Sequence, residues 1–150
     1  MENVSLTTAA VISFCEELED KSSAFYTELA ERWTENAEMF QTFAKDGGKN
    51  KTWVVRTYQE TISDALEASY AFEGLVLGDH AVETTLAQDA GYMDALEMAI
   101  TLEEKARAFY LDAAQRSESL LATIPSAFKR VAKKRGKRKP KLESLLGAAK

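Results

Sequence analysis

Apolar positions recur at helical spacing through most of the chain. The first such segment starts at a possible cap, Thr7 or Thr8, and its inward positions repeat every three or four residues, which is the period of an α-helix. Those positions are Ile12, Cys15, Glu19, Ser22, Tyr26, Leu29 and Trp33. Comparable patterns predict helices over about residues 36–72 and 90–117, and a fourth helix that begins near Thr123.

The fourth pattern passes through a proline. Its inward positions are Leu121, Ile124, Phe128, Val131, Arg135, Arg138, Leu142 and Leu145. Pro140 lies among them, and proline in a helix interior removes a backbone hydrogen bond and crowds the preceding turn. We therefore expect a kink or a break at Pro140.

The lengths of the connections predict the topology. Two of them are short, over about residues 33–36 and 117–123, whereas residues 73–90 form a long one. Short, long, short is typical of a four-helix bundle in which one long crossover joins the second and third helices.

The chain also contains an internal repeat. Glu19–Tyr26 (EDKSSAFY) recurs as Glu103–Tyr110 (EEKARAFY), and Ala44–Lys51 (AKDGGKNK) recurs as Ala132–Lys139 (AKKRGKRK). A repeat of this kind indicates that each half is one structural unit. The sequence thus predicts an all-α fold of two packed helical hairpins, with the bundle over residues 1–141 and a short tail over 142–150.

Charge and composition narrow the class of protein. The net charge is −5, but residues 1–128 carry −14 and residues 129–150 carry +9, which suggests an anionic partner or docking on an acidic surface. The single cysteine, Cys15, and the single histidine, His80, exclude a disulfide within the chain, a four-cysteine site and a multi-histidine site. No apolar run is long enough to span a membrane and no signal segment opens the chain, so a cytoplasmic protein is expected.

Two glutamates occupy inward positions. Glu19 and Glu103 are equivalent in the repeat, and each is followed seven residues later by a tyrosine on the same face, Tyr26 and Tyr110. A carboxylate in a protein core costs several kcal/mol unless it is paired or binds a cation. These glutamates therefore mark the place where chemistry or a buried ion pair is expected, with the two tyrosines as core aromatics beside it.

The segment E-x-x-x-x-A-F-Y, present twice, resembles helices one and three of the rubrerythrin branch of the ferritin-like superfamily, and the resemblance covers about residues 5–139. In that family these helices each supply a glutamate to a di-iron or di-manganese centre, and the other two helices each supply a Glu-x-x-His pair. The resemblance makes Glu19 and Glu103 ligands. The other ligand positions fall on Gly47, Asn50, Ile100, Arg135 and Arg138.

The substituted positions favour an ion pair over a metal centre. Two carboxylates without imidazole, faced by arginines, cannot hold a di-iron centre at ordinary affinity. We expect Arg135 or Arg138 to pair with the glutamates, with Arg107 as a competing partner. On this hypothesis Glu19→Ala destabilises the protein strongly, and adding Arg138→Leu recovers part of the loss.

Three functions follow as hypotheses. The first is a non-catalytic binding or assembly protein, dimeric like its relatives, without a cofactor. The second is an oxidoreductase or storage protein for iron or manganese, in which Glu19 and Glu103 act with Asp46, Glu16 or a residue of a second chain.

The third hypothesis is a nucleic-acid-associated protein, because nine of the 13 residues in 129–141 are lysine or arginine. Its anion-binding candidates are Lys129, Arg130, Lys133, Lys134, Lys137, Lys139 and Lys141. Against it, no aromatic residue interrupts this stretch, and a solvated face or docking on an acidic surface is the simpler interpretation. The amphipathic residues 142–150 are a possible docking tail for a protein partner.

Overall fold

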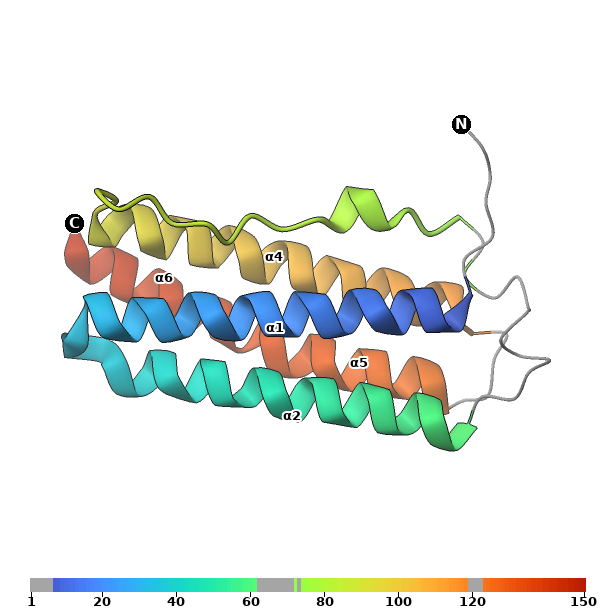
Figure 1. Cartoon of the computed structure of the whole chain (residues 1–150). Helices are drawn as coiled ribbons and strands as arrows, with labels where there is room; N and C mark the ends of the chain where they lie inside the picture. The colour runs from blue at the N-terminus through green and yellow to red at the C-terminus, as the bar shows by residue number, and fades with distance from the viewer. Residues whose placement is uncertain (1–6, 62–71, 73, 119–122) are drawn as a thin grey trace.

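The computed structural model describes residues 7–61, 72, 74–118 and 123–150, and every regular element in this part of the chain is helical. This confirms the prediction of an all-α protein. The long helices are α1 (Thr8–Arg32), α2 (Ala37–Thr61), α4 (Tyr92–Arg116), α5 (Thr123–Gly136) and α6 (Arg138–Ala149) (Figure 1). The short 3-10 helix η1 (Thr34–Asn36) lies between α1 and α2 in the chain, and η2 (Leu77–His80) lies between α2 and α4. The predicted continuation of the second helix over residues 62–71 lies outside the described residues.

Local chemistry explains where the first and third helices begin. The Oγ1 atom of Thr7 accepts a hydrogen bond from the backbone N–H of Ala10 at 3.1 Å, so Thr7 is the cap of α1. At the start of α4 the Oδ2 atom of Asp94 accepts from the backbone N–H of Gly91 at 3.2 Å. Both contacts satisfy N–H groups that a helix end leaves unpaired.

The predicted break in the last helix occurs, but three residues before the proline. Lys137 separates α5 from α6, and Pro140 lies in the first turn of α6. The reason is that proline cannot donate to the carbonyl four residues earlier, that of Gly136, and its ring crowds that carbonyl. After the break, α6 runs without interruption through the predicted boundary between bundle and tail, and Leu142 is buried in the core.

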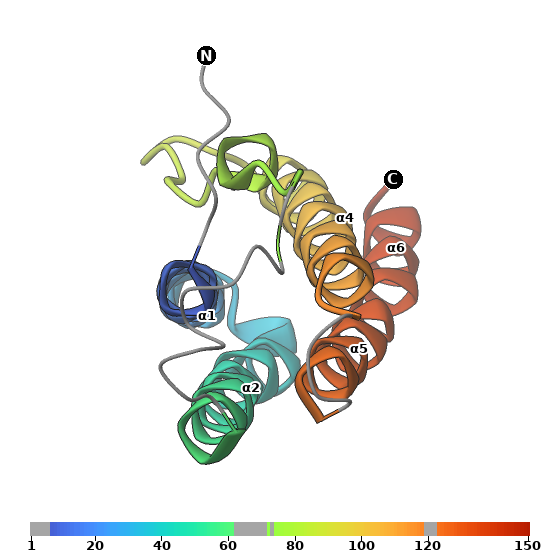
Figure 2. The ribbon, with the colours of Figure 1, turned by 90° about the vertical axis from the view of Figure 1, so that its right-hand side faces the viewer.

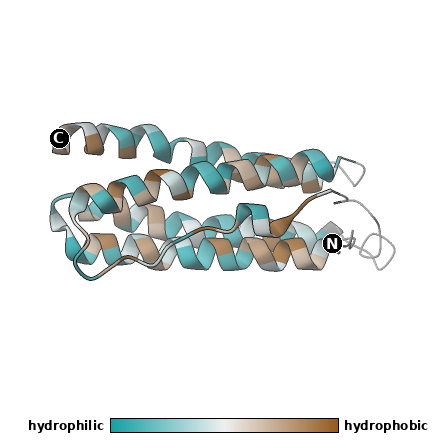
Figure 3. Cartoon of the chain, turned by 90° about the horizontal axis from the view of Figure 1, so that it is seen from above, coloured by the Kyte–Doolittle hydropathy of each residue, from teal (hydrophilic) through white to brown (hydrophobic). Residues whose placement is uncertain are grey.

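The helices pack side by side as a bundle around one hydrophobic core. α1 packs along α2, α4 packs against α5 and α6, and α2 meets α5. Figure 2 shows these helices arranged around a common centre. Each helix carries hydrophobic and hydrophilic residues along its length (Figure 3), as expected of helices that are half buried. The largest buried apolar side chains are Tyr26, Tyr110, Phe25, Phe40, Phe72, Phe109, Phe128, Leu29, Leu96, Leu102 and Leu142.

Residues 74–91, the described part of the connection before α4, lie along the outside of the bundle (Figure 1). The segment is held to α1, where Arg32 Nη1 donates to the carbonyl of Ala87 at 2.8 Å. It is held to α4 by a contact of 3.0 Å between His80 Nε2 and Asp112 Oδ2. Within the part of the chain that is described, none of the helices combines the length and the apolar composition needed to cross a bilayer.

Candidate functional site

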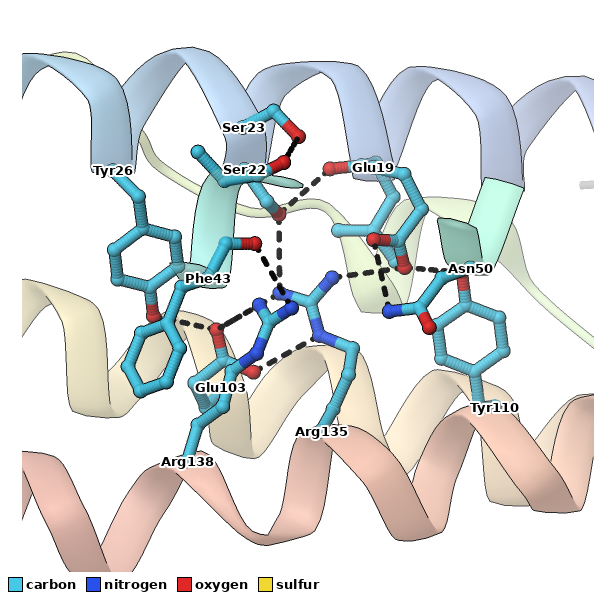
Figure 4. Close-up of polar contacts among 12 residues, drawn as sticks. Glu19, Ser22, Ser23, Tyr26, Phe43, Asn50, Glu103, Tyr110, Arg135 and Arg138 are labelled. Atoms are coloured by element: carbon cyan, nitrogen blue, oxygen red, sulfur yellow. Dashed lines mark hydrogen bonds and ion pairs between the residues drawn. The ribbon is translucent and has the colours of Figure 1, made fainter. Parts of the chain in front are cut away.

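Four charged side chains from α1, α4, α5 and α6 meet in the middle of the bundle (Figure 4). Glu19 is 0% exposed, Glu103 1%, Arg135 0% and Arg138 4%. The two carboxylates are matched by two guanidinium groups, so this buried cluster, called here the Glu–Arg cluster, carries no net charge. Charges this deeply buried are tolerated when each is paired and hydrogen-bonded.

Arg135 is the centre of the Glu–Arg cluster. Its Nε and Nη2 atoms donate to the two oxygens of Glu103 at 2.9 and 3.0 Å, which is the bidentate geometry preferred by a guanidinium and a carboxylate. Its Nη1 atom donates to Glu19 Oε2 at 2.9 Å, and Nη2 also donates to Ser22 Oγ at 3.1 Å. Burial disfavours the charged guanidinium, but the two glutamates outweigh it and raise the pKa of Arg135 above its ordinary value. Arg135 is therefore a permanent cation that joins the two halves of the repeat.

Arg138 pairs with only one of the two glutamates. Its Nη1 atom donates to Glu103 Oε2 at 3.2 Å and its Nη2 atom donates to the backbone carbonyl of Phe43 at 3.1 Å. Its guanidinium lies 5.0 Å from the ring of Phe43 and 5.6 Å from that of Tyr26. The sequence left open which arginine pairs with Glu19, and the structure places Arg135 there. The double substitution that tests the pairing of Glu19 therefore has to change Arg135 rather than Arg138.

The two tyrosines cross the bundle. Tyr26 of α1 donates its hydroxyl to Glu103 Oε2 of α4, and Tyr110 of α4 donates its hydroxyl to Glu19 Oε2 of α1, both at 2.6 Å. Burial and the neighbouring carboxylate raise the pKa of each tyrosine well above its ordinary value. Both tyrosines are therefore protonated donors that hold the carboxylates in place.

The environment also sets the protonation of two further buried groups, Glu103 and Cys15. Burial alone would raise the pKa of Glu103, but Arg135 and Arg138 outweigh it and lower that pKa below the usual value, so Glu103 is ionised. Burial, together with the charge of Glu19, raises the pKa of the Cys15 thiol. A thiol that is buried and protonated is a poor nucleophile.

On α2, the positions equivalent to the two arginines are small or neutral. A Cβ atom on Gly47 would lie only 2.2 Å from Ser23 Oγ, so the glycine leaves room for that hydroxyl, whereas the distance of 3.5 Å from the Cβ position to Glu19 Oε1 is an ordinary contact. Asn50 is 1% exposed, and its Nδ2 atom lies 3.5 Å from Glu19 Oε1. Its Oδ1 atom has no hydrogen-bond partner among the described residues.

Two residues singled out in the sequence do not join the cluster. Arg107 was predicted to face inward, but it is exposed and lies against Gly136. The inward positions on that side of α4 are Ala106 and Tyr110. Because one turn takes about 3.6 residues, Arg107, four residues after Glu103, lies slightly more than one turn further on and therefore at the edge of the inward face. Ile100 is half-buried against the core and brings no polar atom.

Sequence reasoning missed two partners of the arginines. Ser22 accepts a hydrogen bond from Arg135 and donates to the carbonyl of Leu18 at 2.7 Å. Its inward position three residues after Glu19 was a usable signal. The carbonyl of Phe43 was not predictable from side-chain patterns, because every residue carries a carbonyl.

The basic stretch divides into buried and exposed members. Arg135 and Arg138 point into the core, whereas Lys129, Arg130, Lys133, Lys134, Lys137 and Lys141 are exposed. Lys139 is half-buried and pairs with Glu104 at 2.7 Å. The exposed members thus form a surface that is separate from the Glu–Arg cluster.

The residues present do not fit a dimetal centre. One oxygen of Glu19 and both oxygens of Glu103 accept hydrogen bonds from guanidinium groups. Over the described residues, no three His, Cys, Asp or Glu side chains are grouped so that they could hold a metal ion. A divalent cation would also be repelled by two arginines within this cluster.

Comparison with protein-family models, with curated proteins and with solved structures finds no significant match to this chain.

Proposed function

We propose that the chain is a rubrerythrin-like member of the ferritin-like superfamily in which the Glu–Arg cluster takes the place of the dimetal centre, and that it serves a non-catalytic binding or assembly role. The observation that carries this proposal is the position of Arg135. Its guanidinium bridges Glu19 and Glu103, the two carboxylates that the resemblance assigns as metal ligands in such a bundle.

The direction of the helices supports the ferritin-like part of the proposal. In Figure 1, α2 and α4 run in the same direction, and residues 74–91, which precede α4 in the chain, return along the outside of the bundle. A bundle with one long crossover of this kind is a feature of ferritin-like folds. The exchange of tyrosine hydrogen bonds between α1 and α4 agrees with a two-fold repeat of helical hairpins.

The closed environment of the Glu–Arg cluster supports a role without catalysis at this site. All four charged side chains are at most 4% exposed, and their hydrogen bonds are made to one another and to neighbouring core groups. Burying ion pairs adds little net stability, and one attested use of such groups is to fix a single arrangement of helices. We assign that structural use to this cluster, and place the binding role on the surface of the bundle.

Sedimentation equilibrium tests the expected homodimer.

Metal content is the direct test. The purified protein is incubated with Fe²⁺ and Mn²⁺, freed of excess metal and analysed for bound elements. We expect far less than one metal ion per chain with a cooperative unfolding transition intact. Two metal ions per chain would overturn the proposal and favour the oxidoreductase or storage function.

Matched substitutions tell a core site from metal on the surface. Glu19→Gln removes a carboxylate of the cluster, whereas Glu17→Gln removes an exposed one two residues away on the same helix. Metal that is lost in Glu19→Gln and kept in Glu17→Gln would come from the core and would contradict the proposal. Metal that is equally present in both variants lies outside the cluster.

A further inference from the structure

α2 and α5 present a row of exposed cations on each side of their contact. The row on α2 is Lys45, Lys49 and Arg56, and the second row is Arg130 and Lys134 of α5 with Lys137, which directly follows the end of α5. Within each helix the residues follow at intervals of four or seven, which places them along one side of the helix. At 1.5 Å per residue the α2 row extends about 16 Å. These six residues are called here the α2–α5 basic face.

An aromatic side chain lies at the centre of the α2–α5 basic face. Trp53 of α2 is 42% exposed, and the guanidinium of Arg130 from α5 lies over its ring, 3.9 Å from the ring centre. The ring separates two surface hollows. One is lined by Lys45, Lys49, Arg56 and neighbouring residues, and the other by Arg130, Ser126, Thr57 and neighbouring residues. The basic stretch contains no aromatic of its own, but the fold supplies one from another helix.

The charge of this face is not neutralised by the described part of the protein. Among the described residues, none of the six cations forms an ion pair with a carboxylate. The nearby acids are Asp46, which follows Lys45 in the sequence, and Glu60, which lines the hollow beside Arg130. Three other surface lysines are paired with carboxylates, namely Lys21 with Glu17, Lys51 with Asp20 and Lys139 with Glu104. An unpaired row of cations attracts a polyanion and gains affinity when counterions are released.

We propose that the α2–α5 basic face binds single-stranded nucleic acid. Phosphate groups lie along the two rows of cations, and a base stacks on the Trp53–Arg130 pair. The planar pair favours nucleic acid over an acidic polypeptide, because every base has an aromatic face and stacking of this kind is tolerant of sequence. This inference goes beyond the proposed function and does not depend on the absence of metal.

Binding is measured by the fluorescence anisotropy of labelled oligodeoxythymidylate and oligouridylate of about 20 nucleotides. With about four phosphate contacts, log K against log salt has a slope of about −3, and the dissociation constant rises roughly 50-fold between about 50 and about 200 mM salt. The two probes show whether DNA or RNA is preferred. No binding at about 50 mM salt, or binding that does not depend on salt, would overturn the proposal.

Substitutions separate the two parts of the surface. Trp53→Ala is expected to weaken binding roughly 5- to 150-fold with the slope unchanged, because it removes stacking and no charge. Lys49→Gln with Lys134→Gln is expected to make the slope shallower by about 1.4. The matched control, Lys21→Gln with Lys105→Gln, removes two exposed lysines from other helices and is expected to change neither. Equal effects of both pairs would refute the assignment of this surface.

Two further readouts complete the test. In Trp33→Phe the only remaining tryptophan is Trp53, and its emission is expected to be quenched when oligonucleotide binds. Polyglutamate that competes as well as the oligonucleotide would overturn the proposal in favour of an acidic protein partner. A metal-loaded chain that binds oligonucleotide would refute only the proposed function, and a metal-free chain that binds none would refute only this inference.

Discussion

The substitution Arg135→Met tests the Glu–Arg cluster most directly. Methionine is unbranched and adapts to irregular space in a core, so it fills much of the volume of the arginine. It removes the four hydrogen bonds that Arg135 donates to Glu19, Glu103 and Ser22. Glu19 is then left without a cation within the cluster, whereas Glu103 keeps Arg138.

The expected loss is large. Breaking a buried pair by removing one partner typically costs about 3–5 kcal/mol. Because Arg135 serves two carboxylates, we expect the upper end, about 5 kcal/mol, which is comparable with the whole stability of a small domain. Arg135→Met combined with Glu19→Gln removes the unpaired charge as well, and is expected to recover about 2–3 kcal/mol.

The dependence of stability on pH gives a second readout, because a lower pH is expected to act in opposite directions on the Glu103 contribution in the native protein and in Arg135→Met. In the native protein the pKa of Glu103 lies below the ordinary value of 4.5, so its contribution to stability is present above that pH and is lost as the pH falls through the lowered pKa. In Arg135→Met only Arg138 remains to oppose the effect of burial, so the pKa of Glu103 rises. The variant is therefore expected to gain stability, relative to the native protein, as the pH is lowered from about 7 to about 5.

Urea denaturation followed by circular dichroism at both pH values measures these differences. Arg130→Met is the matched control, because it makes the same chemical change on the surface of the same helix. If Arg135→Met costs less than about 1 kcal/mol, or if Glu19→Gln adds to its loss instead of offsetting it, the two charges are not coupled and the reasoning fails.

Further predictions concern the neighbours of the Glu–Arg cluster. Tyr26→Phe and Tyr110→Phe each remove a donor to a buried carboxylate and are expected to cost about 1.5–3 kcal/mol by urea denaturation. Gly47→Ala is expected to destabilise, because a Cβ there would lie 2.2 Å from a serine oxygen, whereas Gly48→Ala, with open space around it, is expected to stabilise by up to about 1 kcal/mol. Cys15 is expected to react with a thiol reagent only as fast as the protein unfolds, since its thiol is buried and its pKa is raised; rapid labelling of the folded protein would contradict this.

Helical spacing and the internal repeat predicted correctly that four charged residues lie inside the bundle, although they misplaced Arg107. Glu19, Glu103, Arg135 and Arg138 were all placed on inward faces from the sequence, and the structure buries all four. The prediction works because a polar residue in an apolar stripe has only one direction in which to point once its helix packs.

Spacing alone could not assign the contacts themselves. Which arginine meets Glu19 depends on the break at Lys137, since the turn between α5 and α6 separates the directions of Arg135 and Arg138. Arg107 was misplaced because a position at the edge of a helical stripe can turn inward or outward. The contact of Trp53 with Arg130 joins helices far apart in the sequence, and no local pattern signals it.

The repeat explains why the Glu–Arg cluster is asymmetric. Gly47 and Asn50 of the first hairpin are equivalent to Arg135 and Arg138 of the second, so one half supplies space and the other half supplies charge. Arginine in both halves would place four cations against two carboxylates and overfill the core, while glycine and asparagine in both halves would leave two carboxylates unpaired. The observed combination satisfies volume and charge together, because Gly47 leaves room for the Ser23 hydroxyl on the α2 side while the guanidinium of Arg135 reaches Glu19 from α5. The loss of Arg135 is therefore expected to be compensated at the glutamates that it touches, whereas a larger residue at Gly47 is expected to be compensated at Ser23.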